Sequence, residues 1–321
     1  MFLLKKFFSK KIIIGLSILV FAILIILINL SLAPQDFPQD EIIKVQKGQT
    51  VSQVANLLNE KQIIKSPFMF KLFVAMISTN RSVKATDYLF EEPQSVLRVA
   101  YRLVNGIQDL PLKKITIIEG MTAQNIADTI KKVIPKFDSK SFMVLAKPYE
   151  GYLFPETYFF YENVSPEDVL NQLRDTFKEK IKTELLAIQA FGKPLEDVIK
   201  MASIVEKEAT NLNDKKIIAG ILWKRLEIGM PLQVDPPFYY ILGKDSASLS
   251  RNDLASDSPY NTYTHKGLPP TPISNPSLDT IQATLTPIKT NYLFYLSDKK
   301  GTMHYAVDHD GHVANKDKYI R

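Results

Sequence analysis

The chain has 321 residues, 45% apolar and 23% charged, which indicates a folded protein of about two domains and excludes a disordered one. It contains no cysteine, which excludes disulfides, thiolate nucleophiles and cysteine metal sites. The net charge is +6, and four of the lysines lie within residues 1–33. The rest of the chain has no basic stripe and no RNA-binding signature, which argues against nucleic-acid binding.

The first expected element is a membrane-spanning helix over residues 12–33. Its residues 12–28 are nearly all apolar, about the length that a bilayer requires. Lysines precede the run, so residues 1–11 are expected in the cytoplasm as a short tail and the rest of the chain outside. A cleaved signal peptide is the alternative, but the run is long for one and residues 31–33 make a poor cleavage site. We expect a single-pass protein of the cell (inner) membrane.

A strand, a glycine turn, a threonine cap and an amphipathic helix are expected twice. After a linker at 34–41, a strand at 42–45 precedes Gly48, and a strand at 115–118 precedes Gly120. In both copies a threonine follows the glycine by two residues, and apolar positions follow at helical spacing. Two copies are too few for a solenoid.

The second half of the chain is predicted to be mainly helical. Long helices are expected over about 165–190, 194–210 and 213–228. Residues 231–276 are rich in Pro, Ser, Asn and Tyr with little periodicity, and such a stretch inside a domain is usually functional surface. Two apolar runs, 292–296 and 303–307, flank a turn and predict a β-hairpin. The fold class is therefore α+β.

Glu206 has the most informative position of any charged residue. It shares the side of the 194–210 helix that carries Ile199 and Ala202. Partial burial raises the pKa of a carboxyl group, and a general acid at neutral pH needs a raised pKa. From position alone, the alternative is a glutamate at the end of the apolar stripe that reaches water or pairs with Lys200 or Lys207.

The irregular segment supplies groups that suit sugar binding. Tyrosine rings stack on the apolar face of a pyranose, and amides bond its hydroxyl and N-acetyl groups. The candidates are Gln233, Asp235, Tyr260, Asn261 and Tyr263. The alternative is a structural loop packed by its own tyrosines.

No metal or cofactor site is expected. His309 and His312, with Asp308 and Asp310, offer metal-binding groups, but no helix is expected there to fix their spacing. The sequence has no P-loop, no dinucleotide fingerprint and no GxSxG motif.

Several motifs resemble one family in order along residues 42–321. Met201-Ala-Ser-Ile-Val-Glu206-Lys-Glu208 resembles the signature of the MltG (YceG-like) family, the endolytic murein transglycosylases. Further matches are Glu150-Gly-Tyr-Leu-Phe-Pro155-Glu156-Thr-Tyr158, Leu232-Gln233-x-Asp235-Pro236, Ser258-Pro-Tyr-Asn261-Thr-Tyr263, Gly267-Leu-Pro-Pro270 and Pro272-Ile-Ser-Asn-Pro276. The chain departs from the family at Pro237, Ile241 and Ser277, and none of these departures is expected to touch Glu206.

The resemblance implies an architecture and a reaction. It implies a membrane helix, a LysM-like α/β subdomain at 42–110 that holds glycan, and a YceG-like catalytic domain at 111–321. The implied reaction is non-hydrolytic cleavage of the MurNAc–GlcNAc β-1,4 bond of nascent glycan strands, which leaves 1,6-anhydro-MurNAc ends. The implied partners, besides peptidoglycan glycan strands, are cell-wall synthases, including penicillin-binding proteins.

The resemblance also assigns roles to residues. Glu206 would be the single general acid/base, and the five candidates of the irregular segment would position substrate. Glu156 is the expected second acid, because Glu208 lies about 200° around the helix from Glu206 and shares its pocket only if the helix ends between them. Two rival functions are a non-catalytic glycan-binding scaffold on the membrane and a hydrolytic muramidase.

Overall fold

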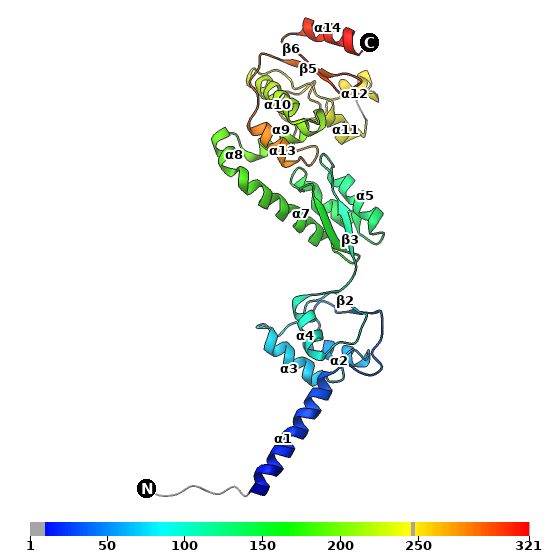
Figure 1. Cartoon of the computed structure of the whole chain (residues 1–321). Helices are drawn as coiled ribbons and strands as arrows, with labels where there is room; N and C mark the ends of the chain where they lie inside the picture. The colour runs from blue at the N-terminus through cyan, green and yellow to red at the C-terminus, as the bar shows by residue number, and fades with distance from the viewer. Residues whose placement is uncertain (1–9, 245–247, 321) are drawn as a thin grey trace, which may run out of the picture. The chain divides into compact units, whose positions relative to one another are not determined.

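The computed structural model describes residues 10–244 and 248–320 (Figure 1). The chain divides into two compact units, Met1–Pro111 (unit 1) and Leu112–Arg321 (unit 2). Both contain helices and antiparallel strand pairs, which confirms a mixed helix and strand fold.

Unit 1 begins with a long apolar helix, α1 (Lys10–Ser31), whose side chains from Ile14 onward are mostly exposed. Its segment Ile14–Ser31 is long and apolar enough to cross a membrane. Just past its C-terminal end, Ala33 packs on the core of unit 1, and Phe37, within the expected linker, is buried in that core. The segment that follows α1 is therefore part of the core of unit 1.

The rest of unit 1 is a pair of antiparallel strands with two helices between them in the chain. Glu41 of β1 lies opposite Phe90 of β2. The elements are β1 (Glu41–Lys44), α2 (Val51–Glu60), α3 (Pro67–Ile77), β2 (Asp87–Phe90) and α4 (Val96–Asn105). Apolar side chains of all five elements form one core.

Unit 2 opens with the same order of elements. Strands β3 and β4 pair antiparallel, with Leu112 opposite Tyr161. The elements are β3 (Leu112–Thr116), α5 (Ala123–Val133), α6 (Ser139–Ala146) and β4 (Thr157–Tyr161). The expected repeat is confirmed, because Gly48 and Gly120 both have positive φ angles and Thr50 and Thr122 both form capping boxes.

The remainder of unit 2 is mainly helical, as expected. The elements are α7 (Pro166–Ile181), α8 (Leu185–Phe191), α9 (Leu195–Glu208), α10 (Leu212–Glu227), α11 (Pro236–Leu242), α12 (Arg251–Leu254), α13 (Leu278–Leu285), β5 (Phe294–Ser297), β6 (Met303–Ala306) and α14 (His309–Tyr319). The expected helix over 165–190 is two helices separated by a 3-10 turn at Lys182–Glu184. The β5–β6 hairpin is confirmed. Helix α14 was not expected, so the expectation that no helix fixes the spacing of His309 and His312 is wrong.

Asn275 ties the segment before α13 to the strand half of unit 2. Its side-chain oxygen accepts hydrogen bonds from the amides of Gly151 and Leu153, both at 2.9 Å. Its side-chain nitrogen donates to the carbonyl of Met121 at 2.9 Å and to the Glu150 carboxylate at 2.8 Å. Asn275 is fully buried, so all four partners would lose a hydrogen bond that water cannot replace if this side chain were absent.

Gly151 is the least replaceable glycine at this junction. It has φ +89°, and a Cβ atom there would lie 2.5 Å from Cβ of Pro272 and 2.8 Å from Cγ2 of Ile199. We expect Gly151→Ala to lower the free energy of unfolding by about 2–3 kcal/mol, from backbone strain and overpacking. Gly192→Ala is the matched control, because Gly192 has φ +75° and open space around it. Equal losses in thermal unfolding of the two variants would contradict the steric argument.

Candidate active site

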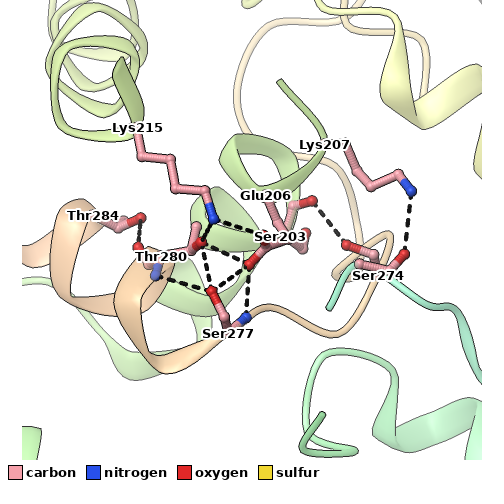
Figure 2. Close-up of polar contacts among 9 residues, drawn as sticks. Ser203, Glu206, Lys207, Lys215, Ser274, Ser277, Thr280 and Thr284 are labelled. Atoms are coloured by element: carbon pink, nitrogen blue, oxygen red, sulfur yellow. Dashed lines mark hydrogen bonds and ion pairs between the residues drawn. The ribbon is translucent and has the colours of Figure 1, made fainter. Parts of the chain in front are cut away.

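The Glu206 carboxylate lies where α9, α10 and α13 pack together (Figure 2). One oxygen accepts a hydrogen bond from the Lys215 ammonium at 2.8 Å. The other accepts from the hydroxyl of Thr280 at 2.6 Å and from both the hydroxyl and the backbone amide of Ser277 at 2.7 Å. The Glu206 side chain is only 7% exposed and that of Lys215 only 9%. The carboxylate is thus held in a buried and well-bonded position.

The expected rise in the pKa of Glu206 is wrong. Burial raises this pKa, but the hydrogen bonds from Lys215, Thr280 and Ser277 outweigh burial and hold it below its ordinary value. Glu206 is therefore ionised at neutral pH and has no proton to donate in this arrangement. Ser277, a departure from the family that was not expected to touch Glu206, binds it directly.

A separate pocket of about 550 Å³ lies at the C-terminal end of α9, around Glu208. Glu208 is the last residue of the helix, and Ala209 after it is extended. The residues lining this pocket include Glu208, Arg225, Gln233, Asp235, Tyr263, Tyr295, His309 and His312. Glu208 lies about 200° around the helix from Glu206, which argued against a shared pocket for the two glutamates. The same rotation directs the Glu208 side chain to the wall that carries Gln233, Asp235 and Tyr263.

The pocket gives Glu208 the titration behaviour that was expected of Glu206. Burial and the nearby Asp235 carboxylate raise the pKa of Glu208 to about 7. Tyr295 and Arg225 act in the opposite direction without cancelling this rise. Glu208 therefore carries a proton in a large fraction of molecules at neutral pH, which a general acid requires.

Three of the residues predicted to contact substrate line the Glu208 pocket. The hydroxyl of Tyr263 donates a hydrogen bond to Asp235 at 2.6 Å, which orients that carboxylate. Gln233 has φ +47°, a left-handed conformation that is uncommon outside glycine, and its amide donates to the carbonyl of Thr262 at 3.0 Å. Backbone strain of this kind is concentrated at functional sites. One further lining atom, Nδ1 of His312, is buried without a hydrogen-bond partner in the described structure.

Two other predicted residues shape the loop and are not among those lining this pocket. Asn261 is fully buried. Its side-chain nitrogen donates to the carbonyls of Leu254 at 2.9 Å and Ser256 at 2.8 Å, and its oxygen accepts from the amide of Tyr263 at 3.0 Å. The Tyr260 hydroxyl shares a 2.8 Å hydrogen bond with that of Thr271. Their contacts are structural, and Asn261 fixes the segment that presents Tyr263.

Glu156, the expected second acid, lies in another groove of about 390 Å³ that also includes Ser277. It forms an ion pair with Lys180 at 3.2 Å, and both side chains are exposed. Hydrogen bonds from the Thr157 amide and Lys180 lower its pKa. Glu156 is therefore ionised at neutral pH and is not grouped with Glu208, Gln233 and Asp235.

Among residues 10–244 and 248–320, no three His, Asp or Glu side chains lie close enough together to hold a metal ion. His309 and His312 pack instead on the ring of Phe294, with centroids 6.0 Å and 5.4 Å away.

Comparison with known proteins gives consistent results. The model of the YceG-like family matches residues 43–318. The chain is 31% identical over 312 residues to an endolytic murein transglycosylase of Bacillus subtilis, covering 87% of this chain and 84% of that protein. It is 28% identical over 331 residues to an endolytic murein transglycosylase of Streptococcus pneumoniae, covering 88% of this chain but only 60% of that protein. The structure is similar to that of a yceG-like protein from Listeria monocytogenes, with a TM-score of 0.59, 28% identity and coverage of 86% and 99% of the two chains.

Proposed function

The chain belongs to the YceG-like family, and from this premise we propose that it is an endolytic lytic transglycosylase of peptidoglycan. The bond cleaved is the β-1,4 linkage between MurNAc and GlcNAc, and the new end is a 1,6-anhydro-MurNAc. The observation that carries the catalytic part of this proposal is the Glu208 pocket, where one carboxyl group of raised pKa faces Gln233, Asp235 and Tyr263.

A single carboxyl group of this kind suffices for the reaction. Hydrolytic glycosidases use two carboxyl groups, because a water or an enzyme nucleophile must also be handled. Here the C6 hydroxyl of the sugar attacks its own C1, and an intramolecular attack needs no external nucleophile. Glu208 first donates its proton to the leaving oxygen and then accepts the proton of the C6 hydroxyl.

Asp235 and Tyr263 support this chemistry from the pocket wall. The negative charge of Asp235 disfavours a second negative charge on Glu208 and so adds to the rise in the pKa of Glu208 that burial causes. The same charge favours the oxocarbenium-like transition state. The Tyr263 hydroxyl holds Asp235 in one orientation. Gln233 supplies an amide for hydroxyl or N-acetyl groups of the sugar.

The signature motif contains two glutamates, and we assign them different roles. Glu206 is the acid/base that the motif position favours, but its lowered pKa and its ion pair with Lys215 suit a positioning residue. In this role it binds α9 to α10 and α13 and so fixes the end of the helix that carries Glu208. Glu206 as the acid/base remains the alternative, and substitution of each glutamate separates the two.

The anchor, the subdomain and the partners complete the proposal. Helix α1 is long and apolar enough to hold the protein in the cell (inner) membrane, with the lysine-rich N-terminus in the cytoplasm and unit 2 outside. Unit 1 beyond α1 is a LysM-like module that holds glycan, as the family resemblance implies for residues 42–110. Cell-wall synthases, including penicillin-binding proteins, are the partners that fit an enzyme of nascent strands.

The function is tested by mass spectrometry of uncrosslinked glycan strands incubated with the full-length protein in detergent. We expect new fragments that end in anhydro-MurNAc, which lack one water relative to reducing ends. Reducing ends would instead identify a hydrolytic muramidase. Binding to strands without any fragments would identify a glycan-binding scaffold.

The pH dependence of cleavage is expected to follow the Glu208 proton. Because its pKa is raised to about 7, the acid form predominates below pH 7 and is lost above it, so kcat/KM should fall about tenfold for each pH unit above 7. Glu150 also has its pKa raised to about 7, mainly by burial, and Glu150→Gln is therefore the control. A descending limb that disappears in Glu150→Gln would contradict the assignment to Glu208.

A further inference from the structure

Helix α3 of unit 1 is apolar on nearly all sides but is covered on only one. Met69, Phe70 and Val74 are buried in the unit 1 core. On the outer side, Phe68 is 65% and Met76 73% exposed, with Leu72 between them at the same face. A helix that is hydrophobic all round is normally buried, so the uncovered face of α3 requires an apolar neighbour.

The charges around α3 indicate what that neighbour is. Between Glu60 and Asp87 the chain contains no acidic residue and five basic ones: Lys61, Lys65, Lys71, Arg81 and Lys84. Lys71 lies within α3 itself and is exposed. Apolar side chains bordered by lysine and arginine are typical of helices that lie in the interface of a membrane with anionic lipids.

The position of α3 in the chain favours the same neighbour. Leu30 in the last turn of α1 and Ala33 just after it pack against the core cluster to which the inner face of α3 belongs. In the view of Figure 1, α3 lies at the edge of unit 1 that α1 enters. The 22 residues of α1 rise about 33 Å, enough to cross the apolar part of a bilayer. If α1 spans the membrane, the rest of unit 1 therefore lies at the membrane surface.

We propose that α3 lies in the outer interface of the membrane that α1 spans, with Phe68, Leu72 and Met76 in the acyl region and Lys71 near anionic phospholipid headgroups. This rests on the proposed membrane anchor. Together the two helices would attach unit 1 to the membrane at two places and fix its orientation, rather than leave it to pivot on a single helix.

The absence of cysteine makes a direct test possible with the full-length chain. Phe68→Cys and Met76→Cys are each labelled with an environment-sensitive fluorophore, and the protein is reconstituted in phosphatidylglycerol and phosphatidylcholine vesicles that contain nitroxide-labelled lipid. We expect the nitroxide lipid to quench both labels about twofold or more, as for groups at interfacial depth. Leu186→Cys is the matched control, because Leu186 of unit 2 is an apolar residue that is 81% exposed, and its label should not be quenched.

A label at Ile23→Cys in α1 separates failure of this proposal from failure of the anchor. If Ile23 is quenched while Phe68 and Met76 behave like Leu186, the anchor holds and the docking of α3 is refuted. If none of the labels is quenched, α1 does not insert and the proposal falls with it. Labels at Phe68 and Met76 that respond to the number of protein copies per vesicle, and not to the quencher lipid, would identify a second copy as the neighbour and also refute the proposal.

Discussion

Glu208→Gln is expected to abolish production of anhydro ends, with kcat/KM reduced about 1,000-fold or more, while the protein keeps its fold. Glutamine preserves the shape of the side chain but can neither donate the proton to the leaving oxygen nor accept one from the C6 hydroxyl. Loss of general acid/base catalysis costs about 100- to 10,000-fold in each role. The measurement is the rate of release of anhydro-MurNAc fragments, with binding to glycan strands measured in parallel.

The matched variant is Glu206→Gln, two residues away in the same motif. Because Glu206 is ion-paired with Lys215 and holds a lowered pKa, its replacement should cost stability and only about tenfold in rate, through the position of α9. The residual activity of Glu206→Gln should still fall with an apparent pKa near 7, that of Glu208. The opposite pattern, an inactive but stable Glu206→Gln beside an active Glu208→Gln, would return the catalytic role to Glu206.

Lys215→Met is expected to lower the free energy of unfolding of unit 2 by about 3–5 kcal/mol. It removes the cation from a pair in which both side chains are less than 10% exposed, and leaves the Glu206 carboxylate buried with hydroxyl and amide donors alone. Removal of one partner of a buried pair is far more costly than removal of both. The double variant Glu206→Gln/Lys215→Met should therefore be more stable than Lys215→Met, as measured by thermal unfolding.

Lys178→Met provides the control for the effect of losing a lysine. Its partner, Asp175, lies three residues away on α7, and both side chains are exposed, so water and salt screen this pair and its loss should change stability little. The destabilisation by Lys215→Met should also depend on pH. The pKa of Glu206 is lowered on folding, so its ionised form stabilises the protein above the ordinary value of 4.5, and this contribution is lost as pH falls below it. A difference between wild type and Lys215→Met that persists at low pH would contradict this origin.

Local sequence patterns were sufficient for most of the elements. The glycine turn and threonine cap before α2 and α5, the proline at the first position of α7 and the apolar spacing of α9 and α10 all depend on neighbours within a few positions. Such features form the same way wherever the segment is placed in the fold. The 3-10 break after α7 was missed because it has no strong turn signal in the chain. Helix α14 does have a local signal, the Asp308 cap, but Gly311 in its first turn disfavours a helix and hid that signal.

Sequence by itself thus determined the family, the repeated order of strand, glycine turn, threonine cap and helix, and the two glutamates of the signature. Only the tertiary structure showed how the surroundings of those two glutamates differ. Ser277 and Thr280 lie 71 and 74 positions from Glu206, and they bring the donors that lower its pKa. Burial, and after it the carboxylate of Asp235 from the irregular segment, raise the pKa of Glu208. The free energy of a proton depends on the charges and donors within a few ångströms, and helical periodicity shows which way a side chain points but not what it meets there.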